Sequence, residues 1–93
     1  MPADTPTDIA ELNRTMSALA RLVADARARV KRHGADAEFC AMVKRGREME
    51  RLLRTSVRNN PKLATATRGY LDMADTQLMA LERTVAATPR DRA

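Results

Sequence analysis

Apolar residues recur along most of the chain at alternating intervals of three and four, which is the spacing of one face of an α-helix. The first run is Ile9, Leu12, Met16, Leu19, Val23, Ala26 and Val30. Because the alternation is unbroken, it predicts a helix that packs along its whole length at a shallow angle. Thr5 is the expected N-cap, with Pro6 in the first turn. The helix is expected to end near His33, followed by Gly34 as a left-handed C-cap residue.

A second helix is predicted from Asp36, as N-cap, to Arg58. Its apolar face is expected to contain Phe39, Met42, Gly46, Met49, Leu53 and Ser56. Gly46 in mid-helix costs about 1 kcal/mol relative to alanine. Either another helix approaches closely at this position, or the glycine is a tolerated weak point; the sequence leaves both interpretations open.

A third helix is predicted from Pro61 to Val85, because Asn60 suits the N-cap position and proline suits the first turn. Its apolar positions are Leu63, Ala66, Tyr70, Leu71, Ala74, Leu78, Leu81 and Val85. Pro89 is expected to end it. The hinge Asn59-Asn60-Pro61 therefore joins the second and third helices into a hairpin.

Three long helices joined by short turns predict an all-α, up-down-up antiparallel three-helix bundle. The 93 residues suit one domain, expected over 5–88, with a flexible arm at 1–4 and a disordered tail at 89–93. Composition agrees, because Phe39 and Tyr70 are the only aromatic residues and alanine and leucine are common.

Positive charge is concentrated in the middle of the chain. The formal net charge is +5, and residues 27–58 hold ten basic and four acidic residues, a local excess of six. Arg47, Arg51, Arg54 and Arg58 follow at gaps of four, three and four, which places them on one face away from the apolar one. This row is the candidate contact for an anion or a partner. It is either a solvated face partly paired with neighbouring glutamates, a nucleic-acid contact, or a contact with an acidic protein or anionic membrane surface.

Candidate catalytic and metal-binding residues do not form a recognisable constellation. Cys40 is the single cysteine, which excludes an intrachain disulfide, and it is expected to be a small buried residue beside Phe39. His33 suits a helix end better than a metal site, because no ligand lies at suitable spacing. Asp72 and Asp75 are expected to face solvent. We therefore expect no enzymatic activity, no bound metal and no cofactor.

The chain contains neither a signal segment nor an apolar run approaching the roughly 20 residues that a membrane span needs. The expected location is the cytoplasm.

The segment from Lys44 to Thr84 resembles the C-terminal helical part of the XpaC family, the 5-bromo-4-chloroindolyl phosphate hydrolysis proteins. The resemblance is carried by Arg51-Leu52-Leu53-Arg54, by Asn59-Asn60-Pro61-Lys62-Leu63, and by Arg68-Gly69-Tyr70-Leu71-Asp72 with Thr76, Leu78, Leu81 and Glu82. Met73, Ala74 and Thr84 depart from that pattern. The resemblance implies a helical hairpin; it implies no active-site residue, and hydrolase activity does not follow from it.

Taken together, these patterns predict a non-catalytic helical module that binds a protein partner or associates with itself as a homodimer. The alternative is a nucleic-acid-binding protein that uses Arg47, Arg51, Arg54 and Arg58. The two differ in the partner that the arginine row would contact.

Overall fold

The computed structural model describes residues 8–67 and 69–87, and these residues contain no β-strand. The elements are α1 (Ile9–His33), α2 (Ala37–Asn59), the 3-10 turn η1 (Pro61–Leu63), α3 (Ala64–Thr67) and α4 (Tyr70–Ala87). The predicted all-α class is confirmed. The predicted count of three helices is not, because the described residues form four α-helices. The arm predicted at 1–4 and the tail predicted at 89–93 lie outside the described residues.

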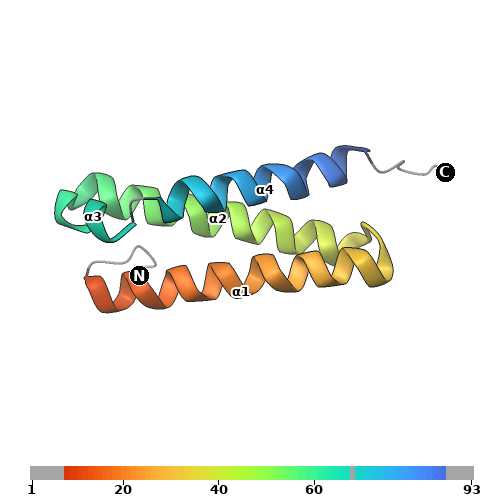
Figure 1. Cartoon of the computed structure of the whole chain (residues 1–93), viewed down its shortest axis with the longest axis horizontal. Coiled ribbons are helices and arrows are strands. Elements are labelled where there is room, and N and C mark those ends of the chain that lie inside the picture. Colours follow the sequence, from red (N-terminus) through yellow and green to blue (C-terminus); the bar gives the residue numbers. More distant parts are fainter. Residues whose placement is uncertain (1–7, 68, 88–93) are drawn as a thin grey trace.

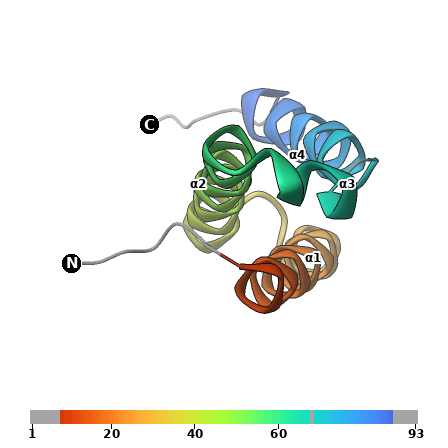
Figure 2. The same cartoon turned by 90° about the vertical axis from the view of Figure 1, so that its left-hand side faces the viewer.

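The three long helices lie side by side along the molecule, and consecutive long helices run in opposite directions (Figure 1). Seen from one end, α1, α2 and α4 occupy the corners of a triangle (Figure 2). η1 and α3 lie at the end of the molecule where α2 finishes. The molecule is 47 Å long and 18 Å across its thinnest dimension, so its core is a narrow strip between the long helices.

Side-chain and glycine caps set the limits of α1. The carboxylate of Asp8 accepts a hydrogen bond of 2.8 Å from the backbone N–H of Glu11, so Asp8 is the N-cap. The prediction that Thr5 is the N-cap is therefore wrong, and the helix begins at Ile9. The predicted end at His33 is confirmed: Gly34 has φ of 74°, and its N–H donates to the carbonyl of Val30 at 3.0 Å.

The turn between α1 and α2 is fixed by one carboxylate. Asp36 caps α2 as predicted, accepting from the N–H of Phe39 at 2.9 Å. Arg29, in the last part of α1, donates to both carboxylate oxygens of Asp36, at 3.1 and 2.7 Å. The same side chain therefore starts one helix and holds the end of the other.

The core consists mainly of the residues that the three-four alternation selects. Its buried apolar side chains are Leu12, Leu19, Val23, Ala26, Phe39, Val43, Leu53, Leu63, Leu71, Ala74, Leu78 and Leu81. On α2 the expected Met42 and Met49 are partly buried and pack against this core, but Val43 and Glu50 are buried more deeply. Thr67 likewise replaces Ala66, which is exposed.

Gly46 lies where the three long helices converge. A Cβ atom at this position would be 2.9 Å from a side-chain methyl of Leu78 in α4 and 3.6 Å from one of Leu19 in α1. That distance to Leu78 is shorter than a normal carbon–carbon contact. Of the two interpretations of this glycine, the structure supports close helix approach.

The predicted third helix is interrupted. After η1 and α3, Gly69 adopts φ of 82°, and α4 starts at Tyr70. A positive φ is outside the right-handed helical region, and glycine adopts it without a Cβ clash. The apolar periodicity continues across this residue, which is why the pattern alone predicts one helix. The expected cap is present at the start, where Asn60 accepts from the N–H of Lys62 at 3.3 Å.

Candidate functional site

The predicted row of four arginines does not form one outward face. Arg47 and Arg54 are directed toward α4 and form ion pairs, whereas Arg51 and Arg58 are exposed. Because α2 packs against both α1 and α4, it has little free surface. Two of its four arginines therefore contact α4. A ligand approaching the row would therefore meet two free guanidinium groups, from Arg51 and Arg58.

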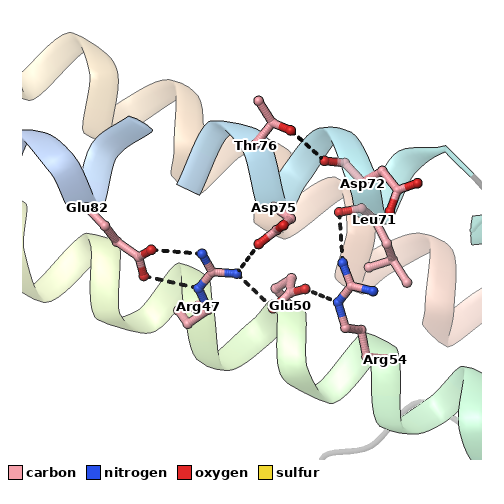
Figure 3. A network of polar contacts seen from close by, with 8 residues as sticks. All are labelled: Arg47, Glu50, Arg54, Leu71, Asp72, Asp75, Thr76 and Glu82. Carbon is pink, nitrogen blue, oxygen red and sulfur yellow. Dashed lines mark hydrogen bonds and ion pairs between the residues drawn. The ribbon is translucent and has the colours of Figure 1, made fainter. Parts of the chain in front are cut away.

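Arg47 is the centre of an ion-pair network between α2 and α4 (Figure 3). Its guanidinium donates to both carboxylate oxygens of Glu82, at 3.0 and 2.8 Å. It also donates to Asp75 at 2.7 Å and to Glu50 at 3.2 Å. Asp75 was expected to face solvent, and this contact corrects that prediction. A planar guanidinium with five N–H donors is suited to bind three carboxylates at once.

Glu50 links the two arginines that face α4. It is 3% exposed and accepts hydrogen bonds from Arg47 and, one turn further along α2, from Arg54. Arg54 also donates to the backbone carbonyl of Leu71 at 3.4 Å. A buried carboxylate is tolerated when its charge is paired in this way. Glu50 follows Arg47 by three residues and precedes Arg54 by four, and this spacing was the available sequence signal for its role.

The electrostatics of the network favour the charged forms. Hydrogen bonding from Arg47 lowers the pKa of Glu82, and hydrogen bonding to Glu82 raises the pKa of Arg47. The pKa of Arg54 is raised mainly by its hydrogen bond to Glu50. Two arginines face three carboxylates, so the network carries no spare positive charge. It holds α4 against α2, and it offers no vacant anion site.

Beside the network lies an open groove of about 750 Å³ between the first half of α2 and the end of α4. We call it the α2/α4 groove. Its lining residues are Ala37, Cys40, Ala41, Val43, Lys44, Arg47, Glu48, Arg51, Glu82 and Val85. The small apolar residues that α2 contributes lie toward its starting end and its charged residues follow, whereas α4 contributes Glu82 and Val85. This groove could not be predicted from the sequence, because Glu82 and Val85 are distant in the chain from the α2 residues.

Small and charged residues divide the α2/α4 groove into two parts. Cys40 is partly exposed in it, which corrects the expectation of a fully buried cysteine. Lys44, Glu48 and Arg51 are exposed, and in the part of the chain that the structure describes none of them forms an ion pair. Arg51 lies near enough to Glu82 to help lower its pKa. These charges are available to a partner.

The other residues that could take part in catalysis or metal binding, His33 and Ser56, have roles in the helices that contain them. His33 lies exposed in the last turn of α1, where a cation suits the helix dipole. The hydroxyl of Ser56 is buried and donates to the carbonyl of Leu52 at 3.0 Å. Within residues 8–67 and 69–87, no three histidine, cysteine or acidic side chains are grouped so that they could hold a metal ion.

Comparisons with protein-family models, with curated proteins and with solved structures give no significant match. Among the described helices, none has the length and apolar character required to cross a membrane.

Proposed function

We propose that this protein is a non-catalytic interaction module of the cytoplasm, whose α2/α4 groove binds an acidic amphipathic helix of a partner protein. The observation that carries the proposal is the groove itself. It combines an apolar, small-residue end with the exposed basic side chains of Lys44 and Arg51, which form no ion pair with a described residue.

The shape of the groove supports a helical ligand. Ala37, Cys40 and Ala41 recur at intervals of three and one along α2, and their small side chains allow a second helix to approach closely. Val85 adds an apolar wall from α4. Recognition of an amphipathic helix by such a groove depends on apolar anchors spaced three or four residues apart.

The charges along the groove specify the ligand further. Lys44 and Arg51 are seven residues apart, which is about two helical turns or 10 Å. Glu48 lies between them. The complementary helix therefore carries acidic residues two turns apart, with a neutral or basic residue between them. Complementarity of this kind contributes to specificity and to the rate of association.

The single cysteine provides a direct test. Cys40 lies in the groove, so a photoreactive maleimide attached to it will cross-link the groove's occupant. The labelled protein is exposed to lysate of its native host and illuminated, and the cross-linked peptide is sequenced. We expect an acidic amphipathic segment. A synthetic peptide of that sequence should then bind, and Arg51→Glu should weaken its affinity about tenfold, which corresponds to one lost charge pair at an interface rim.

Matched variants separate groove binding from general effects. Ala41→Glu places a charge in the groove, whereas Ala20→Glu places the same side chain on an exposed position of α1. Binding should be lost in the first variant and retained in the second. Equal binding by both variants would overturn the proposal. Cross-linking to nucleic acid, with affinity that falls steeply with salt, would support the alternative function instead.

A further inference from the structure

The connection between α3 and α4 contains Gly69, one of the two positive-φ glycines of the described residues. α3 ends at Thr67 and α4 begins at Tyr70, and Gly69 redirects the chain through its φ of 82°. Nothing lies within 4 Å of the position where a Cβ atom of Gly69 would be. Space is therefore available for a side chain at Gly69, and the positive φ is what disfavours one there. Meanwhile the apolar spacing on both sides of Gly69 is that of one continuous helix.

The side chains through which α4 binds α1 and α2 follow Gly69 in the chain, and their partners precede it. Leu71, Ala74, Leu78 and Leu81 are buried against the other helices. Asp75 and Glu82 bind Arg47, and the hydroxyl of Tyr70 donates to the carbonyl of Met16 at 3.0 Å. α4 is thus a unit that the rest of the chain binds through a defined surface. The α4 of a second copy has the same side chains and fits the same surface.

We propose that the surface of α1 and α2 that binds α4 also accepts α4 from a second copy of this chain, giving a dimer with exchanged helices. In the exchanged form, Gly69 adopts a helical conformation and α3 continues into α4. Each α4 then extends away from its own α1 and α2 and docks on those of the partner. The apolar contacts and the ion pairs of the monomer are all re-formed across the dimer. This inference is independent of the α2/α4 groove proposal.

The balance between the two forms is set largely at Gly69. The cooperative extension of a helix favours the exchanged form, while the monomer avoids the entropy loss of association. Glycine favours the monomer in two ways, because it tolerates a positive φ and is a poor helix former. Exchange of an identical element through a short hinge is a low-cost route to a dimer.

The first test is the substitution Gly69→Ala. Alanine disfavours the positive φ of the turn and favours a continuous helix, and each dimer contains two such hinges. We expect the apparent dimer dissociation constant to fall by about 100-fold or more. Light scattering across a concentration series measures it. As a control, Gly34→Ala changes the other positive-φ glycine, which lies between α1 and α2 and outside the proposed hinge.

The second test identifies which segments are exchanged. Arg47→Glu and Glu82→Arg each place like charges together within a monomer. When the two variant chains are unfolded and refolded together, exchange of α4 pairs Glu at 47 with Arg at 82 in one half of the dimer and restores the native pair in the other. We expect a 1:1 heterodimer with higher thermal stability than either variant alone. If the single variants fold poorly, the rescue is still measurable by circular dichroism of the mixture.

The matched control uses Arg29→Glu and Asp36→Arg, which disrupt the pair at the α1–α2 turn. Both residues precede Gly69, so exchange of α4 cannot bring the complementary charges together, and no rescue is expected. The proposal is supported if mixing raises the thermal stability of the Arg47→Glu and Glu82→Arg variants but not that of the Arg29→Glu and Asp36→Arg variants. A Gly69→Ala variant that stays monomeric at millimolar concentration, together with no rescue of the 47/82 mixture, would overturn it. A dimer of Gly69→Ala without rescue would overturn it also, because the dimer would then use another surface.

Discussion

α2 meets α1 and α4 through interfaces of different chemistry. The buried residues of α1 are all apolar: Leu12, Leu19, Val23 and Ala26. α4 also buries four apolar residues, but it adds Asp75 and Glu82, which bind Arg47. α1 forms an ion pair through Arg29, whose partner Asp36 lies at the turn itself.

This difference separates the strength of packing from its specificity. Burial of apolar surface stabilises a helix pair without fixing its position along the axis, because the hydrophobic effect is non-directional. Hydrogen-bonded ion pairs act only in one geometry. The short connection through Asp36 fixes the position of α1 relative to α2, whereas η1 and α3 separate α4 from α2 in the chain. The Arg47 network then determines the position of α4 along α2.

The largest expected effect is on the apolar interface. Leu19 is fully buried, and Leu19→Ala should lower the free energy of unfolding by about 3 kcal/mol, from lost burial and the cavity left behind. The loss should be the same in low and high salt, because no charge is involved. Urea unfolding measures it. Met79→Ala, at a position with 43% exposure, is the control and should cost less than about 0.5 kcal/mol. A loss below 1 kcal/mol for Leu19→Ala would show that α1 packs differently.

A somewhat smaller and pH-dependent effect is expected on the charged interface. Arg47→Met leaves Glu50, Asp75 and Glu82 without their common partner, and should cost about 2 to 3 kcal/mol at pH 7. This cost is below the roughly 3 to 5 kcal/mol for breaking a fully buried pair, because Asp75 and Glu82 are partly exposed. Urea unfolding at pH 7 and pH 3 measures it. Arg51→Met, at an exposed position of the same helix, should cost under about 0.5 kcal/mol.

The sign of the pH effect follows from the lowered pKa of Glu82. Its stabilising contribution is complete above the ordinary pKa of a glutamate and is lost as the pH falls through the lowered value. Wild-type stability should therefore fall in acid. The variant should lose less, since protonation relieves repulsion among its unpaired carboxylates. The difference between the two proteins should narrow at pH 3, and a constant difference would show that Arg47 acts by packing alone.

The smallest effect is expected at the α1–α2 turn. Hydrogen bonds from Arg29 and from the N–H of Phe39 lower the pKa of Asp36 to about 2. The stability that Asp36 contributes should be present above pH 4 and be lost as the pH falls toward 2. NMR titration should give the low pKa in the wild type and a value nearer the ordinary one in Arg29→Met. The melting temperature should decrease from wild type to Asp36→Asn to Asp36→Ala, since asparagine retains the cap and alanine does not. Equal melting temperatures for the two variants would contradict the capping role.

The sequence predicted the apolar side of the molecule better than the charged side. The unbroken spacing from Ile9 to Val30 identified the packed face of α1 except at Ile9, which is exposed, and Gly34 and Asp36 identified the turn. These signals are local, since caps and periodicity depend on neighbouring residues. Thr5 and Asp8 are both capable N-caps only three residues apart, and local chemistry did not distinguish them.

The charged side depends on contacts between distant residues. Glu50 occupies a buried position that periodicity assigned to Met49, because its partners include Arg47, which is held in turn by Asp75 and Glu82. Nothing within α2 shows that these carboxylates will arrive from α4. Gly69 was visible as a glycine in a helical pattern, but whether the helix would continue or turn there depends on the surface against which α4 packs.

Tyr70 gives the molecule a built-in optical probe. It is the only tyrosine in a chain without tryptophan, and it lies in the first turn of α4. Burial raises the pKa of its phenol, and its hydroxyl binds the carbonyl of Met16 in α1. Alkaline absorbance titration of the unmodified protein therefore reports one event, the release of α4 from α1, without any label. Phenol ionisation that begins at the ordinary pH for tyrosine would signal a detached helix, and ionisation delayed to higher pH a docked one.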